Sequence, residues 1–420
     1  MKVIKNLIPT KSSNQIDNLL FFFFSIYPIT FLFGNFAINL FLFLFNLLLV
    51  IGIINKSYKY NLLNKYIFYL LLCLFCFFIL NLFFSNNYQL SYPRVLKFIF
   101  IIGSILSFKQ LIESFEDKEI NKLYKIWAII FVLVVIDVNF ELVFKSNILG
   151  FKSFMPGRIA SFSGNELNIG HYFSAFCLLF LSFVNLNYKN ISTNIIISIS
   201  LIIISFAIGE RSNFIRTLII ISAYIFIVLE LKVKFKFLSL STLIFFFIIL
   251  LNIKPGYKLR YLDQFTKVLN KEGINYYFDN TVYGAHYNVA KEIFKDNMFF
   301  GAGIKNFRTE SYSDKYENLD HKFNDQRANT HPHQIHYEFL AETGLVGYIS
   351  FTIFICLSIY LSIKSYLKTR NYYQLSGMFF VIICLMPLIP SGSFFSTYSS
   401  SLFWLNYGIM VGYINKKTKF

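Results

Sequence analysis

The chain has 420 residues, of which 56% are hydrophobic and 15% are charged, and it contains 54 Phe and 28 Tyr. Soluble domains average about 45–50% apolar and about 25% charged residues, so this composition excludes an ordinary soluble domain, a disordered chain and a small disulfide scaffold. It predicts a protein that crosses a membrane several times. The net charge of +17 would suggest nucleic acid as a partner of a soluble protein, so it must first be compared with membrane topology.

Twelve segments have the length and apolarity of membrane spans, because a helix needs roughly 20 apolar residues to cross about 30 Å of hydrocarbon. They are residues 19–33, 36–55, 66–85, 95–112, 126–145, 169–186, 193–209, 214–230, 237–252, 343–363, 373–390 and 400–415. The polar–apolar alternation of an outer-membrane barrel is missing. We therefore predict an all-α, polytopic membrane protein with about 12 transmembrane helices. Residues 1–252 would hold helices 1–9, residues 253–342 one large and partly helical periplasmic loop, and residues 343–420 helices 10–12.

The lysines and arginines near the ends of these spans predict the orientation. With the N-terminus in the cytoplasm, the inner segments carry 20 Lys and Arg residues and the short outer segments carry 5. This asymmetry predicts that both termini are cytoplasmic. The loop of residues 253–342 then lies outside, and its 12 basic and 12 acidic residues balance. The excess positive charge therefore belongs to the membrane-bound remainder, which argues against a nucleic-acid partner.

The loop carries five of the six histidines, namely His286, His321, His331, His333 and His336. Residues 283–297 have the apolar spacing of an amphipathic helix, and Gly301-Ala302-Gly303 follows as a break whose backbone amides could bind an anion. After a polar stretch comes His331-Pro332-His333, where Pro332 suits the first position of a new helix. Histidines at a helix N-terminus would lie beside an anion-binding dipole.

Three interpretations of the histidines remain open from the spacing alone. They could be metal ligands, but no Cys and no cluster of Asp or Glu completes a coordination sphere nearby, so we expect no metal. They could belong to a solvated polar loop. They could also supply a general base, because an imidazole with an ordinary pKa near 6.5 can accept a proton at neutral pH.

Two polar turns at the predicted outer ends of spans provide further candidates. Gly209-Glu210-Arg211 lies between two apolar segments, where a charged residue is costly and commonly functional. Gly157-Arg158 is followed by Gly164-Asn165-Glu166-Leu167. Arginine binds phosphate oxygens in a bidentate manner and stays charged. These arginines next to a histidine-bearing loop indicate a lipid-linked phosphate or diphosphate as substrate.

The combination of these motifs resembles the O-antigen ligase and O-antigen polymerase superfamily of bacterial membrane glycosyltransferases. The matching stretches are Gly301-Ala302-Gly303-Ile304-Lys305-Asn306-Phe307, His331-Pro332-His333-Gln334 and Glu342-Thr343-Gly344-Leu345-Val346-Gly347, with the two outer arginine turns upstream. Gln334 stands where the family usually has Asn. The number of spans and the large late loop also agree with the family's layout.

The resemblance implies an enzyme, an O-antigen ligase-like glycosyltransferase of the bacterial inner membrane with a periplasmic active site. Its donor would be a glycan on undecaprenyl diphosphate, its acceptor a sugar hydroxyl of the lipid A core or another glycan, and it would need no cofactor. By position His333 would be the catalytic residue, although His331 stays an alternative. The implied substrate-binding residues are Arg211, Arg158, Arg308, His331, Glu166 and Glu342.

Two other functions stay open at this point. A polysaccharide polymerase of the same superfamily would use the same donor and extend a second lipid-linked repeat. A glycolipid flippase or transporter would also have about twelve helices, but it would not need a large histidine-bearing loop, and its halves would more commonly show internal repeats.

Overall fold

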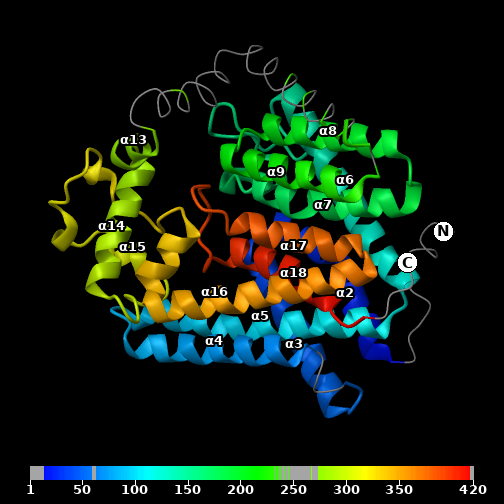
Figure 1. The fold of residues 1–420 in the computed structure, drawn as a ribbon, viewed down its shortest axis with the longest axis horizontal. Coiled ribbons are helices and arrows are strands. Elements are labelled where there is room, and N and C mark those ends of the chain that lie inside the picture. Colours follow the sequence, from blue (N-terminus) through cyan, green and yellow to red (C-terminus); the bar gives the residue numbers. More distant parts are fainter. Residues whose placement is uncertain are drawn as a thin grey trace.

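The computed structural model describes residues 14–58, 63–230 and 273–416, together with isolated residues between 231 and 272. Every regular element within this part is helical (Figure 1). Nine of these described helices are long and apolar enough to cross a membrane, namely α2 (Gln15–Phe33), α3 (Asn35–Ile54), α4 (Lys65–Phe83), α5 (Tyr88–Ser114), α6 (Asp117–Phe144), α7 (Ile169–Tyr188), α8 (Ile191–Ile208), α9 (Arg211–Val228) and α16 (Ile335–Thr369). The predicted all-α membrane fold is confirmed. The predicted span 237–252 lies outside the described residues.

The last two predicted spans form shorter helices than expected, α17 (Tyr372–Cys384) and α18 (Thr397–Gly412). At 1.5 Å per residue the 13 residues of α17 extend about 20 Å, which is less than the thickness of a hydrocarbon core. Helix α17 ends before Pro387 and Pro390, which cannot donate the hydrogen bonds of a continuing helix. The irregular residues 385–396 that follow, called here the α17–α18 segment, replace the end of the predicted span 373–390.

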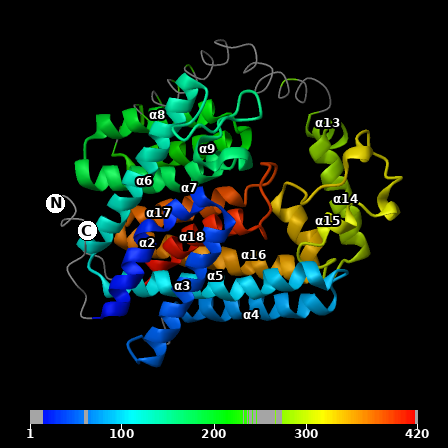
Figure 2. The same cartoon turned by 180° about the vertical axis from the view of Figure 1, so that it is seen from behind.

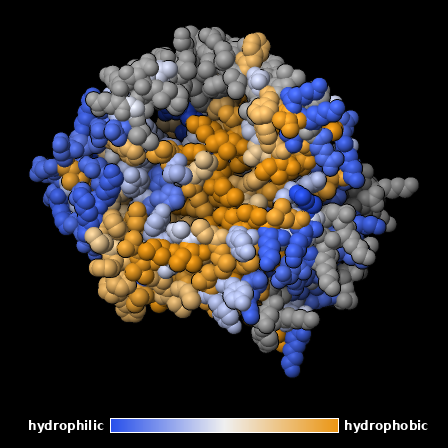
Figure 3. Space-filling model, viewed as in Figure 1, coloured by the Kyte–Doolittle hydropathy of each residue, from blue (hydrophilic) through white to orange (hydrophobic). Residues whose placement is uncertain are grey.

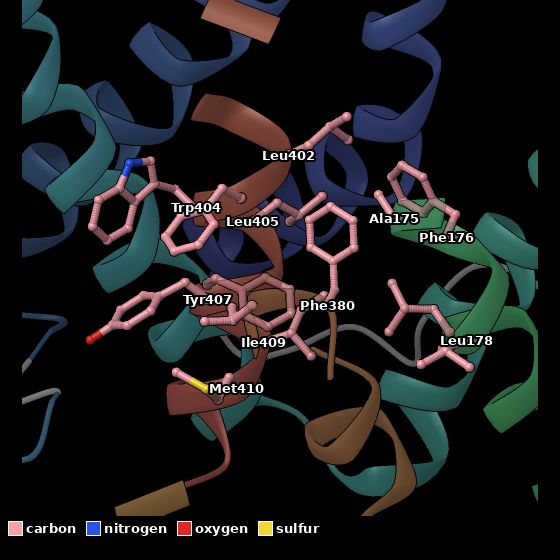
Figure 4. Packing of buried hydrophobic residues seen from close by; sticks show 14 of the residues in the cluster. Ala175, Phe176, Leu178, Phe380, Leu402, Trp404, Leu405, Tyr407, Ile409 and Met410 are labelled. Atoms are coloured by element: carbon pink, nitrogen blue, oxygen red, sulfur yellow. The ribbon is translucent and has the colours of Figure 1, made fainter. Parts of the chain in front are cut away.

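Helix α18 forms the centre of the helical bundle. Almost all of its residues are buried, from Thr397 through Gly412, as expected for a helix that is enclosed by other helices. Trp404 and Tyr407 of α18 and Phe380 of α17 pack together in this core, with Phe176 of α7 nearby (Figure 4). On the opposite side α3 and α5 pack against α18 (Figure 2). The packed centre of the fold therefore includes the helix that directly follows the α17–α18 segment.

The surface of the bundle is apolar over its middle and hydrophilic at its ends. Large hydrophobic side chains such as Phe33, Phe36 and Phe83 are exposed, and apolar residues cover the middle of the face in Figure 3, while hydrophilic residues gather over one end. Contiguous apolar surface of this kind marks contact with a membrane. The distribution supports a multi-pass membrane protein.

The hydrophilic end is formed by the described part of the large loop, residues 273–342. It contains α13 (Ile274–Asp279), α14 (Val282–Asp296), α15 (Phe307–Glu310) and the short 3-10 turns η3 (Asp314–Tyr316) and η4 (Asn324–Gln326). The amphipathic helix predicted at residues 283–297 is confirmed as α14, which buries Val289 and Ile293. These elements lie beside the beginning of α16 (Figure 1).

Basic side chains mark the other end of the bundle. The ammonium group of Lys109 donates hydrogen bonds to the carbonyl oxygens of Gly412 and Ile414, at 2.8 and 2.9 Å. Lys416 forms an ion pair with Asp117 at 2.8 Å. Helix α16 runs from the loop end to this basic end (Figure 1), so the histidines and these lysines are separated by the length of the bundle.

The loop is attached to the bundle through the α4–α5 turn. The side-chain amide of Asn81 donates to the carbonyl oxygens of Phe300 and Glu342, at 2.6 and 3.2 Å, and its oxygen accepts from the Ile304 amide at 3.1 Å. Asn306 accepts a hydrogen bond from the Asn87 amide at 2.7 Å. A buried asparagine with both ends satisfied holds two distant parts of the chain in one fixed register.

Candidate active site

The glycine-rich turn at residues 301–303 packs against a kink in α16. Gly301, Gly303 and Gly344 all have positive φ angles, of 72°, 104° and 65°. A Cβ atom on Gly301 would lie 2.5 Å from the Gly344 nitrogen, and one on Gly344 would lie 2.5 Å from the Gly301 nitrogen. Only glycine allows both the left-handed backbone and this close approach.

The backbone amides of this turn are already bonded to α16. The amides of Ala302 and Gly303 donate to the carbonyl oxygens of Ala341 and Glu342, at 2.9 and 3.0 Å. The carboxylate of Glu342 accepts from the amides of Lys305 and Phe307, at 2.7 and 3.3 Å. The anion at this turn is therefore the protein's own Glu342, which is fully buried. This placement favours a role in holding the turn over direct contact with substrate.

A second buried carboxylate links the turn to the α17–α18 segment. Glu338 accepts hydrogen bonds from the Ser393 hydroxyl at 2.5 Å and from the Phe394 amide at 2.7 Å. The ammonium of Lys305 bonds to the same Ser393 oxygen at 2.5 Å. Burial lowers the pKa of Lys305, and the carboxylate of Glu338 opposes this shift. Neither Lys305 nor Glu338 was predicted as part of the site, although a lysine inside a glycine-rich turn was a visible signal.

The helix after the histidine motif begins three residues later than expected, at Ile335 instead of Pro332. Gln334 forms its N-terminal cap, and its side-chain oxygen accepts hydrogen bonds from the amides of His336 and Tyr337. A polar side chain at this position satisfies amides that have no partner within the helix. The prediction that Pro332 starts the helix is wrong, because the two histidines lie in an irregular turn before the cap.

His333 occupies the centre of a cluster of aromatic and histidine side chains. Its ring centroid is 4.1 Å from that of His331 and 5.3 Å from those of His286 and Tyr283. The side-chain amide of Asn329 lies 3.2 Å from Nε2 of His333 and 3.4 Å from Nε2 of His286. His286 and Asn329 were not predicted as site residues: His286 lies in α14, far from the motif in sequence, whereas Asn329 lies only four residues before His333.

The backbone of His333 has a positive φ of 58°, which costs a non-glycine residue roughly 1–2 kcal/mol. Its carbonyl oxygen accepts a hydrogen bond of 2.7 Å from the Ser391 amide. A strained backbone that the surrounding structure maintains is common where a side chain must point in one direction. Here the strain directs the His333 ring toward Asn329 and His286.

The two neighbouring histidines differ in what their nitrogens contact. His331 has both nitrogens occupied, because Nε2 donates to the Ser391 carbonyl at 3.2 Å and Nδ1 lies 3.0 Å from the Thr330 hydroxyl. His333 has one such contact, the Asn329 amide. This difference favours His333 over His331 as the group that meets a substrate hydroxyl.

Burial lowers the pKa of all three clustered histidines. The pKa of His333 falls to about 4, through burial and then the nearby His286. The pKa of His331 falls to about 2, through burial and then His333 and Lys305, and that of His286 is lowered mainly by burial. Each imidazole is therefore neutral at pH 7 and can accept a proton. A bound anion beside them would raise these values again.

The two predicted outer turns are in direct contact with each other. Gly209 has a φ of 81°, and a Cβ atom there would lie 1.9 Å from the Gly157 carbonyl oxygen. The Arg158 guanidinium lies 3.6 Å from the carboxylate of Glu210. Glu210 also accepts from the Gly170 amide at 3.1 Å. A cavity of about 280 Å³ opens beside Arg158, with Glu141 and Lys145 also in its wall.

A further arginine in this region was missed from the sequence. Arg216 is 2% exposed, and its guanidinium donates to the Asn213 side chain at 3.2 Å and to the Pro390 carbonyl at 2.9 Å. Asn213 in turn bonds to Glu210. Because Arg216 lies in the apolar run after Arg211, its position inside a predicted span was the available signal. It connects the outer turns to the α17–α18 segment.

The α17–α18 segment therefore contacts each part of the site in chain order. Pro390 bonds to Arg216, Ser391 to both His331 and His333, and Ser393 to Lys305 and Glu338. The sequence predicted residues up to 390 as part of a span. Ser393 and Phe394 of this segment are buried, whereas Pro387, Leu388 and Gly392 are exposed.

The remaining predicted residues lie around this centre. Arg211 is the first residue of α9 and is partly exposed. Burial raises the pKa of Tyr277 in α13, and the charge of Arg211 opposes this shift. Glu166 ends the 3-10 turn η1 (Ser161–Glu166) and is exposed, as is Arg308 in α15. Among the described residues, no group of three His, Cys, Asp or Glu side chains is arranged to hold a metal ion. His336 bonds instead to the Leu385 carbonyl and to Tyr348.

Comparison with known proteins identifies one family. Residues 195–352 match a family model described as O-Antigen ligase. The matched range includes Arg211, His333 and Glu342, but not Arg158 or Glu166. A search of curated proteins finds no match.

Proposed function

We propose that this chain transfers a glycan from undecaprenyl diphosphate to a sugar hydroxyl of the lipid A core, a proposal that is supported by the match of residues 195–352 to the O-Antigen ligase family model. The reaction would take place at the periplasmic face of a bacterial inner membrane, with both termini in the cytoplasm. The single observation that carries the proposal is the α17–α18 segment, which bonds to His333 through Ser391, to Lys305 of the glycine-rich turn through Ser393 and to Arg216 beside the outer turns through Pro390.

In this proposal His333 acts as the general base. The acceptor hydroxyl attacks the anomeric carbon of the donor sugar, its proton passes to Nε2 of His333, and the bond from the sugar to the diphosphate breaks. The Asn329 amide, 3.2 Å from Nε2, marks the position that the acceptor hydroxyl would take. General-base catalysis needs this hydrogen-bonding distance before the pKa matters.

Burial and then the nearby His286 lower the pKa of His333 to about 4. A bare imidazole with this pKa is neutral at pH 7 but is a weak base. A diphosphate close to the ring would stabilise the imidazolium and raise the pKa toward the working pH. Donor binding would therefore increase the strength of the base when the reaction needs it.

The outer turns supply the charge that a diphosphate requires. Arg158 and Arg211 are the proposed donor-binding residues, and Arg216 supports them from the buried side through Asn213 and Glu210. Negative charge grows on the diphosphate as the sugar leaves, and fixed cations stabilise that charge without reorganisation. No nucleotide or metal is needed in this scheme, because the donor is already activated.

The other predicted residues take positioning roles. Glu342 fixes the glycine-rich turn through two backbone amides, and His331 fixes the α17–α18 segment through Ser391. Glu166 is exposed near the outer turns and remains a proposed contact of the sugar. Arg308 is considered separately below.

The test is the surface-glycan profile of strains that carry single substitutions. His333→Ala and Arg211→Ala should abolish glycan attachment, with normal amounts of protein in the membrane. His321→Gln is the matched control, because His321 lies in the same loop but bonds to the Phe278 carbonyl outside the cluster. Wild-type glycan in the His333→Ala strain would refute the assignment of the base.

Deletion of the whole chain separates the possible activities. A ligase defect leaves the lipid A core without polymer, while lipid-linked chains accumulate. A polymerase defect leaves single repeats attached to the core, and donor trapped on the cytoplasmic face would instead identify a flippase.

A further inference from the structure

A second group of cations lies where α5, the glycine-rich turn and α15 meet. Arg94 and Lys97 come from α5, Lys305 from the end of the glycine-rich turn, and Arg308 from α15. Arg94 and Lys97 line one cavity together with Ile304, the residue before Lys305. Burial lowers the pKa of Lys305, and the charges of Arg94 and Arg308 lower it further. Like charges repel, so a group of this kind needs a compensating anion.

The protein supplies less negative charge here than positive charge. The two carboxylates beside these four cations are Glu338 and Glu342, and both are occupied by Ser393 or by backbone amides. Among the described residues, no carboxylate lies within 4.0 Å of Arg94, Lys97 or Arg308. Arg94 has one weak neutral partner, the Thr397 hydroxyl at 3.3 Å.

Lys97 is the second and independent sign of a missing anion. Its ammonium nitrogen is buried and has no hydrogen-bond partner among the described residues. It lies in the wall of a small cavity together with Arg94, Ser400 and aromatic side chains. The cavity measures about 20 Å³, enough for roughly one water molecule. A buried ammonium without a partner is costly, and a water in this cavity could join it to an anion held by Arg94 at the mouth.

The cations lie where they would meet the phosphate of a lipid-borne substrate whose sugar reaches the histidines. Arg94 lies two turns inside α5, at the end of the bundle that carries the loop. His331 bonds to Ser391 and Lys305 bonds to Ser393, so the cations and the histidines meet along one short stretch of chain. From Pro390, which bonds to Arg216, to Thr397, which bonds to Arg94, the chain can span at most about 25 Å.

From this geometry we propose that Arg94 and Arg308, supported by Lys97, bind a phosphate of the lipid-borne acceptor. This assignment rests on the proposed function. It means that the acceptor lipid carries a phosphate or diphosphate of its own. Donor diphosphate at Arg158 and Arg211 and acceptor phosphate at Arg94 and Arg308 then flank His333. Two sources share this chemistry, a second undecaprenyl diphosphate-linked glycan for a polymerase and a phosphorylated lipid A core for a ligase.

Binding stoichiometry tests the proposal with the full chain in phosphatidylcholine nanodiscs. Native mass spectrometry would count bound undecaprenyl diphosphate, and lipid A would be the second probe. We expect the wild type to bind one undecaprenyl diphosphate at the donor site and a second equivalent of one of the two probes. The double variant Arg94→Gln/Arg308→Gln should weaken only that second equivalent, by about tenfold or more for the loss of charged hydrogen bonds.

Matched variants separate failure of this inference from failure of the proposed function. Arg158→Gln/Arg211→Gln should lose the first equivalent and keep the second, and retention of both by this variant would contradict the proposed donor site instead. Lys125→Gln, an exposed lysine on α6, should change neither. Lys97→Met should weaken the second equivalent while unfolding at the same or a higher temperature, because it removes a buried ammonium without a partner.

The identity of the second probe decides the source of the phosphate. A second undecaprenyl diphosphate indicates a polymerase, and lipid A indicates a ligase. The proposal is overturned if neither probe depends on Arg94 and Arg308, or if phosphatidylglycerol displaces the second equivalent at equal concentration. A lower unfolding temperature for Lys97→Met with unchanged binding would assign Lys97 a purely structural role and overturn its part in the site.

Discussion

Replacing Glu342 with Gln should release the glycine-rich turn from α16. Both carboxylate oxygens accept backbone hydrogen bonds, one from Lys305 at 2.7 Å and one from Phe307 at 3.3 Å. Burial raises the pKa of Glu342, and Lys305 together with the two amide hydrogen bonds opposes that shift by favouring the ionised carboxylate. Glutamine keeps one acceptor and turns an NH₂ group toward the second amide, which leaves that buried amide without a partner.

The magnitude follows from these two contacts. A hydrogen bond to a charged group contributes about 1.5–3 kcal/mol, and an unsatisfied buried donor costs about 1–3 kcal/mol. We therefore expect local opening of the turn to become easier by about 2–4 kcal/mol. Because each 1.4 kcal/mol corresponds to a factor of ten, the Lys305 and Phe307 amides should exchange with solvent roughly 30 to 1,000 times faster.

Hydrogen exchange followed by mass spectrometry, on a peptide that contains residues 303–308, measures this directly. Glu317→Gln is the matched control, since Glu317 is an exposed carboxylate in the same loop, and it should exchange like the wild type. Glycan transfer should fall in Glu342→Gln although His333 is unchanged. Exchange within about threefold of the wild type would refute the reasoning that Glu342 holds the turn.

Two further predictions concern pH and the outer turns. The pKa of His333 is about 4 in the folded chain against an ordinary value of 6.5, so between these values the unfolded chain binds more protons and stability falls as the pH falls. At pH 5 this lowers the free energy of unfolding by about 2 kcal/mol. In thermal unfolding measured at pH 7 and at pH 5, His333→Gln should therefore lose less stability than the wild type. An equal loss in both proteins would contradict the lowered pKa. Gly209→Ala should strongly reduce the amount of folded protein in detergent, because its Cβ would lie 1.9 Å from the Gly157 carbonyl. Gly150→Ala has a similar φ of 86° but open space around it and should lose only about 1–2 kcal/mol; equal effects in a melting assay would show that the contact with Gly157 is unimportant.

The sequence predicted most of the fold because membrane helices depend on local composition. Eleven of the predicted spans coincide with described helices, and the separation of the first two at Gly34 is confirmed by its φ of 90°. Helix α14 was predicted for the same reason, since an apolar face recurs at a fixed spacing. The end of α17 was not predicted, because Met386, Leu388 and Ile389 keep the average hydropathy high across two prolines.

The site was less accessible from the sequence, because its contacts join distant residues. His331 bonds to Ser391, 60 residues away, and Arg216 bonds to Pro390, 174 residues away. Spacing along one helix cannot reveal such pairs. It did locate His333, Arg158 and Arg211, whose roles stay predictions, but it could not show that the α17–α18 segment connects them.

The anchoring of the loop by Asn81 determines how this protein can be studied. Asn81 of α4 satisfies the carbonyl oxygens of Phe300 and Glu342 and the Ile304 amide, and Phe84 stacks on Phe300 at a centroid distance of 4.0 Å. If residues 273–342 were expressed without the helices, these polar groups would bond to water instead of Asn81, Phe300 would lose its stacking partner, and neither contact would fix the turn any longer. A water-soluble fragment of the loop would therefore lose the geometry of its histidines, and inhibitor screening or antibody selection should use the intact protein in a lipid environment.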